Sequence, residues 1–128
     1  MAVQYSIRQG IIRMEFVGTY EPRDVVSSFL DALADPTCPT PAGLLIDVTR
    51  SETLESRPAA DIRMVAEFLE PYSDRIGGRC AVVVASEAQF DKSQIGALRS
   101  KAVGIDAQVF GSIDEATAWL DGSSVEQD

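Results

Sequence analysis

The sequence predicts a single α/β domain with a mostly parallel, five-stranded sheet and about four helices. Residues 43–48 form a short, nearly continuous apolar run, which is typical of a strand buried on both faces of a sheet. Strand-like and helix-like patterns alternate after an opening hairpin, and such alternation predicts parallel strands joined by right-handed crossovers. The chain has 128 residues, which is long enough to bury the core of one domain.

The opening hairpin is predicted from two strand-like segments, residues 3–8 and 11–17, separated by Gln9 and Gly10. Pro22 then suits the first turn of a helix that extends to Leu33. A cluster of prolines over residues 36–41 ends this helix and predicts a connecting loop.

The second half of the chain continues the alternation. A polar loop follows residues 43–48, and Pro58 opens a helix to Tyr72 with an apolar stripe. Residues 80–85 and 107–110 are predicted as strands, and a serine with capping-box spacing precedes each of the two helices that follow them. The apolar residues expected on these helices are Ile62, Val65, Ala66 and Leu69, then Phe90, Ile95, Leu98 and Ala102, then Ile113, Ala116, Trp119 and Leu120.

We expect the domain to cover residues 1–121 and residues 122–128 to form a flexible acidic tail. The net charge of −9, from 11 basic and 20 acidic side chains, argues against a nucleic-acid partner. No apolar run approaches the roughly 20 residues of a membrane span, and the first residues do not resemble a signal peptide. These features predict a cytoplasmic location.

The amino-acid composition also limits the catalysis and the metal binding that the sequence predicts. The chain has no histidine, which removes the commonest general base and the commonest metal ligand. Its two cysteines, Cys38 and Cys80, lack metal-binding spacing and are expected to be reduced. The sequence therefore predicts a protein that is not an enzyme and that needs no cofactor or metal.

The loop over residues 49–57 is the predicted functional region, because ligands and partners of open α/β sheets bind beyond the carboxyl ends of the strands. The candidate residues for a switch or a partner-binding site lie in this loop or beside it: Asp47, Thr49, Arg50, Ser51, Ser56, Arg57, Thr19 and Tyr20.

Each candidate has a structural explanation beside the functional one. Asp47 is expected to accept hydrogen bonds from the neighbouring loop backbone rather than to act as a base or metal ligand. Ser56 is predicted to cap the helix at Pro58, with a phosphorylation switch as the alternative. Arg50 and Arg57 would suit an incoming phosphate or carboxylate, or form surface ion pairs. Tyr20 would contact a partner or cover the core.

Several strings of residues resemble those of the SpoIIAA-like family, relatives of the STAS domains of anti-sigma-factor antagonists. The resemblance spans residues 4–120 and rests on the order and spacing of these strings: Gly18-Thr19-Tyr20, Leu44-Leu45-Ile46-Asp47, Arg79-Cys80-Ala81-Val82-Val83, Val109-Phe110, and Glu115-Ala116 followed by Trp119-Leu120. It implies the fold and a regulatory role.

The resemblance also places Ser56 where anti-sigma-factor antagonists carry a phosphorylatable serine. Here Arg57 and Pro58 replace the small residues beside that serine, and residues 90–95 keep little of the family pattern. The leading hypothesis is a small STAS-like module that binds another protein or a second copy of itself as a homodimer. The alternative is a carrier or sensor of a small apolar, lipid-like ligand, held between the sheet and the helices at residues 22–33 and 58–72.

Overall fold

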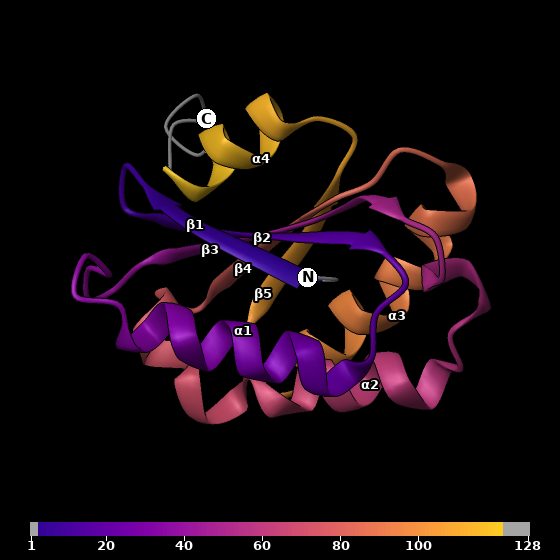
Figure 1. Cartoon of the computed structure of the whole chain (residues 1–128), viewed down its shortest axis with the longest axis horizontal. Helices are drawn as coiled ribbons and strands as arrows, with labels where there is room; N and C mark the ends of the chain where they lie inside the picture. Colours follow the sequence, from indigo (N-terminus) through magenta and orange to yellow (C-terminus); the bar gives the residue numbers. More distant parts are fainter. Residues whose placement is uncertain (1–2, 122–128) are drawn as a thin grey trace.

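The computed structural model describes residues 3–121 (Figure 1). The flexible tail predicted at residues 122–128 lies outside this range. Within it the chain forms five strands, four α-helices and two 3₁₀-helices: β1 Val3–Arg8, β2 Ile11–Gly18, α1 Pro22–Ala34, β3 Gly43–Ser51, η1 Leu54–Ser56, α2 Ala59–Phe68, η2 Glu70–Ile76, β4 Arg79–Val83, α3 Glu87–Ala102, β5 Asp106–Phe110 and α4 Ile113–Leu120.

The strands lie in the sheet in their sequence order, β1-β2-β3-β4-β5. β1 and β2 form the predicted antiparallel hairpin, and every other neighbouring pair is parallel. Gln9 (φ 53°) and Gly10 (φ 81°) make the tight hairpin turn, where the positive φ angles match the twist of the strands. The fold class predicted from the sequence is confirmed.

The helices are distributed unequally over the two faces of the sheet, as Figure 1 shows: α1, α2 and α3 lie on one face, and α4 lies on the other. Right-handed crossovers that always add the next strand on the same side of the sheet must all pass over the same face. Two hydrophobic cores result. The larger lies beneath α1–α3, and the smaller joins Leu45, Ala81 and Val83 to Ala116 and Trp119 of α4.

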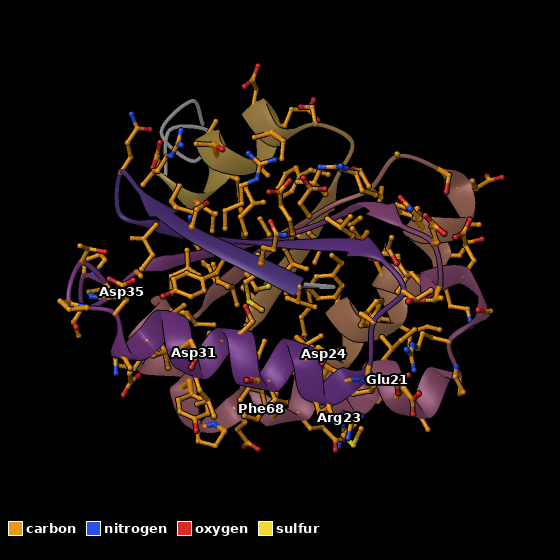
Figure 2. All side chains as sticks on the ribbon, in the orientation of Figure 1. Glu21, Arg23, Asp24, Asp31, Asp35 and Phe68 are labelled. Atoms are coloured by element: carbon orange, nitrogen blue, oxygen red, sulfur yellow. The ribbon has the colours of Figure 1, made fainter. Side chains whose placement is uncertain are left out.

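An aromatic cluster joins α1 to α2. Phe29 of α1 makes edge contacts with Phe68, at 5.7 Å between ring centroids, and with Tyr72, at 5.5 Å. Figure 2 labels Phe68 of α2. At the end of α1, Asp35 accepts a hydrogen bond of 2.9 Å from the Tyr5 hydroxyl, which ties the helix to β1.

Three element boundaries differ from the sequence prediction. β3 runs on to Ser51, because a bulge with one extra residue in β3 allows pairing with β2 to resume at Val17–Arg50 and Gly18–Ser51. α2 ends at Phe68 and is followed by η2, since Pro71 cannot donate the backbone hydrogen bond that an α-helix needs. β4 ends at Val83. In the described part of the chain, no helix is long and apolar enough to cross a membrane.

The buried face of α3 is also different from the predicted one. Phe90 and Leu98 were expected to point to the core, but 39% and 69% of their surfaces are exposed. The buried residues are instead Gln89, Ser93, Ala97 and Ser100. This face consists of small and polar residues, so the apolar side chains alone predicted the wrong orientation of the helix.

Candidate functional site

The predicted site residues do not form one cluster, because the sheet separates them. Side chains alternate along β3, so Leu44 and Val48 face the core beneath α1–α3 whereas Asp47 points to the α4 face. Tyr20 belongs to the core on the α1–α3 side, and Arg57 packs over its ring there. The structure therefore shows two separate polar clusters at the carboxyl end of β3.

The first cluster is centred on Asp47, which is only 5% exposed. One carboxylate oxygen accepts a bond of 3.0 Å from the Arg13 guanidinium. The other accepts from the backbone N–H of Thr49 at 2.9 Å and from its hydroxyl at 2.7 Å. Both oxygens are thus occupied, and the expectation that Asp47 bonds the loop backbone is confirmed. This arrangement fixes the end of the strand.

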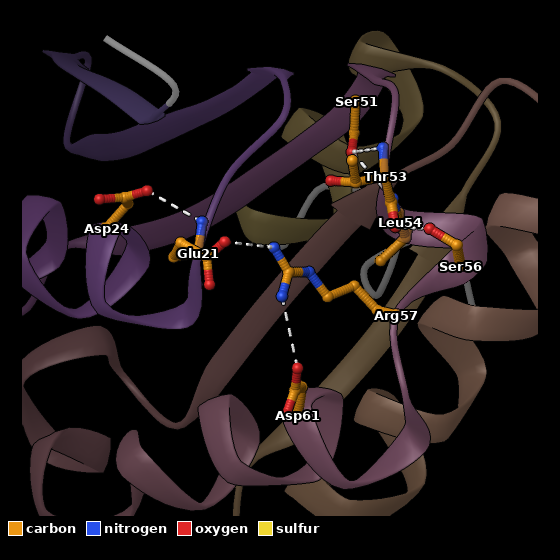
Figure 3. A network of polar contacts seen from close by, with 8 residues as sticks. All are labelled: Glu21, Asp24, Ser51, Thr53, Leu54, Ser56, Arg57 and Asp61. Atoms are coloured by element: carbon orange, nitrogen blue, oxygen red, sulfur yellow. Dashed lines mark hydrogen bonds and ion pairs between the residues drawn. The ribbon is translucent and has the colours of Figure 1, made fainter.

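Ser51 has a comparable structural role. Its side chain is buried, and Oγ accepts from the backbone N–H groups of Leu54 at 3.2 Å and Thr53 at 3.4 Å. Figure 3 shows these bonds at the start of η1. Ser51 thereby satisfies two donors that a short 3₁₀-helix leaves without partners.

Ser56 does not cap α2, so that prediction is wrong. The N-cap is Pro58, and the exposed Ser56 hydroxyl donates backwards to the Thr53 carbonyl at 3.1 Å. The reason is local: Pro58 disfavours helical geometry at Arg57, which is extended (φ −68°, ψ 137°) and separates Ser56 from the helix. Ser56 remains accessible at the end of η1.

Arg57 is the centre of the second cluster (Figure 3). Its guanidinium lies 4.8 Å from the centroid of the Tyr20 ring. It also pairs with Glu21, before α1, at 3.7 Å and with Asp61 of α2 at 3.4 Å. The Lys92 ammonium of α3 donates to the Arg57 carbonyl. One residue of the predicted loop thus joins the starts of α1 and α2 to α3.

The remaining candidates differ in exposure. Tyr20 is buried and packs against Phe16 at 4.8 Å, so it covers the core. Burial raises the pKa of the Tyr20 phenol, and the nearby Arg57 charge partly opposes that rise. Thr19 and Arg50 are exposed, and within residues 3–121 Arg50 makes no ion pair.

An apolar cavity of about 90 Å³ lies beside the Arg57 cluster, between the sheet and the helices α2 and α3. Strand residues line it from the start of β4 and β5 to the end of β2 and β3, so it runs along the strands. Its walls are mainly apolar, and the charged side chains that line it, Arg57 and Asp61, lie at one end. Among the lining residues are Ile46, Val82, Ile62, Val65, Arg57 and Asp61.

Sequence reasoning placed an apolar site between the sheet and the helices at residues 22–33 and 58–72. The structure forms the cavity against α2 as expected, but α3 supplies the other wall and α1 contributes only Pro22. The α3 wall consists of Ser93, Gly96, Ala97 and Ser100. Small residues at spacings of three and four along a helix leave room beside a sheet, and this signal was present in the sequence.

Cys80 lines the far end of the cavity. Burial alone raises the pKa of its thiol to about 12, so Cys80 is protonated and unreactive at neutral pH. Cys38 and Cys80 are both free. No group of three potential metal ligands occurs within the described residues. The arrangement is suited to holding an apolar group rather than to nucleophilic chemistry.

No protein-family model and no curated protein matches the sequence. Among solved structures, the chain is similar to an uncharacterised protein of the DUF3478 family from Shewanella loihica PV-4, described as having a SpoIIAA-like fold. The two chains share 19% sequence identity, with a TM-score of 0.58, over 93% of this chain and 92% of the other. The comparison shows that this protein has a SpoIIAA-like fold, as the resemblance in the sequence implied.

Proposed function

We propose that the protein is a non-enzymatic, STAS-like regulatory module that senses or carries a small apolar ligand. The observation that carries this proposal is the apolar cavity between the sheet and the helices α2 and α3. A concave, mostly apolar site with a few polar groups at one end is the usual form of a small-molecule site. The absence of histidine and the complete bonding of Asp47 support a binding role rather than catalysis.

The size of the cavity limits the ligand. An engineered apolar cavity of about 150 Å³ in another protein binds benzene. The cavity of about 90 Å³ here is smaller, so it accommodates a short apolar group of a few carbon atoms. A longer chain would have to extend beyond the cavity.

A titration with straight-chain alcohols of increasing length, followed by NMR, tests the proposal. Each added methylene should strengthen binding about fourfold, which corresponds to about 0.8 kcal/mol, until the cavity is filled. Val82→Phe places a larger side chain in the cavity wall and should abolish binding. Val26→Phe is the matched control, since Val26 is also half-buried but does not line the cavity. Absence of binding across the whole series would refute the proposal.

A second candidate function is regulation through a protein partner at the edge formed by Thr19, Arg50 and Ser56. These side chains are exposed at the end of the sheet where β2 and β3 finish, and they would be accessible to another protein. Phosphorylation of Ser56 would add a charge of about −1.5 to −2 to this edge. Pull-downs with wild type and Ser56→Asp test the idea, because a switch requires that the aspartate variant lose the partner while it keeps its melting temperature.

The partner could also be a second copy of the chain. β1 is an edge strand of the sheet, and its outer backbone groups are available for pairing with another β1. Sedimentation at tens of micromolar, a rough choice for a weak interface, distinguishes a homodimer from a monomer.

A further inference from the structure

We infer that the cavity takes a short amphiphile with an anionic head group, and that Arg57 binds this head. The inference rests on the proposed ligand-binding function and names the class of ligand. Arg57 lines the cavity, and only 14% of its side chain is exposed. Within the described residues no other arginine or lysine lines this cavity.

The ion pairs of Arg57 are too long to satisfy it fully. Its contacts are 3.4 Å to Asp61 and 3.7 Å to Glu21. Charge-assisted bonds between a guanidinium and a carboxylate are usually about 2.7–2.9 Å long. A largely buried cation with such distant partners has lost hydration without gaining strong bonds, so a better-placed anion would stabilise it.

Both carboxylates can release Arg57 at little cost. The Glu21 side chain is 62% exposed, so water can solvate it when Arg57 moves to a ligand. Asp61 lies in the first turn of α2, where the helix dipole stabilises a negative charge. On the other side of the loop, Lys92 adds a second positive charge and has no ion pair within residues 3–121. These features favour exchange of the carboxylates for a ligand anion.

The course of the cavity sets the orientation of the ligand. Arg57 lies at the end of the cavity where β2 and β3 finish, whereas Cys80 and Ala107 lie where β4 and β5 begin. A head group on Arg57 therefore directs the apolar chain along Ile46 and Val82 towards Cys80. Carboxylates and phosphates share the geometry that the guanidinium recognises.

The test compares ligands that have the same four-carbon skeleton and different heads: butanoate, butyl phosphate, butanol and butylamine. We expect wild type to bind one or both anions about 10- to 100-fold more tightly than butanol, the range expected for hydrogen bonds to a charged group. Comparison of butanoate with butyl phosphate shows whether the site prefers a carboxylate or a phosphate head. Butylamine should bind most weakly. Chemical-shift changes at the amides that line the cavity beyond Arg57, towards Cys80 and Ala107, would show that the chain points away from Arg57.

Arg57→Gln should abolish the preference for the anions over the alcohol. Arg63→Gln is the matched control, because Arg63 is an exposed arginine of α2 that does not line the cavity. If Arg57→Gln unfolds, Arg57→Lys tests the same point. Lysine keeps the positive charge but lacks the planar guanidinium that can donate two parallel hydrogen bonds, so it should reduce the preference for the anions over the alcohol. Equal affinity of wild type for butanol and for both anions overturns the inference while the proposed function stands. No binding of any of the four refutes both.

Discussion

Two arginines on opposite faces of the sheet have contrasting environments. The Arg13 side chain is 39% exposed and makes a bond of 3.0 Å to Asp47, whose other oxygen is also fully used. The Arg57 side chain is 14% exposed, yet its two ion pairs are 3.4 Å and 3.7 Å long. The more buried cation thus has the weaker partners.

This difference separates a structural cluster from a binding cluster. A buried charge is stabilised only when good geometry and further hydrogen bonds offset the loss of hydration. The Asp47 cluster meets this condition and fixes the end of β3. The Arg57 cluster does not meet it and lies beside an apolar cavity, which is where a ligand can supply the missing partner.

The largest loss of stability should follow from replacing Asp47, the centre of the structural cluster. Asp47→Ala removes the acceptor of the Thr49 N–H and leaves Arg13 only the longer contact of 3.5 Å to Glu15, so it should lower the free energy of unfolding by about 2–3 kcal/mol. Urea denaturation measures the change. Asp47→Asn keeps an acceptor for Thr49 and should cost clearly less. A loss below about 0.5 kcal/mol for Asp47→Ala would contradict the structural role.

A smaller loss of stability is expected when Ser51, at the start of η1, is replaced. Ser51→Ala removes the acceptor of two backbone N–H groups in a buried position and should cost about 1–2 kcal/mol. Thermal unfolding followed by circular dichroism is sufficient to detect it. Stability equal to that of wild type would mean that water replaces the Ser51 hydroxyl.

Removal of the second arginine should change stability less than removal of Asp47. Arg57→Gln breaks two long ion pairs with partly exposed carboxylates and should cost no more than about 1 kcal/mol in urea denaturation. A loss of stability as large as that of Asp47→Ala would show that the Arg57 cluster contributes as much to the fold as the Asp47 cluster does.

The same variant should alter the titration of Tyr20. The folded-state pKa of Tyr20 is raised by burial and lowered in part by Arg57, so Arg57→Gln should raise it further. A raised folded-state pKa stabilises the fold below the unfolded-state pKa near 10, and this contribution is lost as the pH rises through the folded-state value. Tyrosinate absorbance measures the shift, with Tyr20→Phe identifying the signal. An unchanged titration would contradict the contact.

The smallest change in stability is expected when Ser56 is replaced. Its hydroxyl is exposed and makes one bond to a loop carbonyl, so Ser56→Ala should change the free energy of unfolding by less than about 0.5 kcal/mol. Ser51→Ala, measured by the same urea denaturation, is the matched comparison. A loss of 1 kcal/mol or more at Ser56 would contradict this minor role and favour the predicted capping role instead.

The sequence by itself determined the order of strands and helices and the opening hairpin, because apolar periodicity, turn residues and prolines act locally. The SpoIIAA-like fold followed from the resemblance of several strings of residues to that family. It also identified Asp47 as a hydrogen-bonded strand end. It did not determine which helix residues face the sheet in α3, where Leu98 is exposed and Ser93 is buried. Helix orientation depends on the space that α2 and the sheet leave, and the apolar side chains of the helix alone do not contain that information.

Only the tertiary structure decided how the candidate residues are grouped. Asp47 and Arg57 are ten positions apart in the sequence but lie on opposite faces of the sheet. Alternation along β3 directs Asp47 to the α4 face, whereas the chain that leaves β3 through η1 places Arg57 over Tyr20 on the α1–α3 side. The cavity likewise combines residues of four strands, β2 to β5, with residues of α2 and α3, and these elements are distant in sequence. Long-range packing of small residues against a sheet creates such a space, so the cavity and its single arginine became visible only in the folded chain.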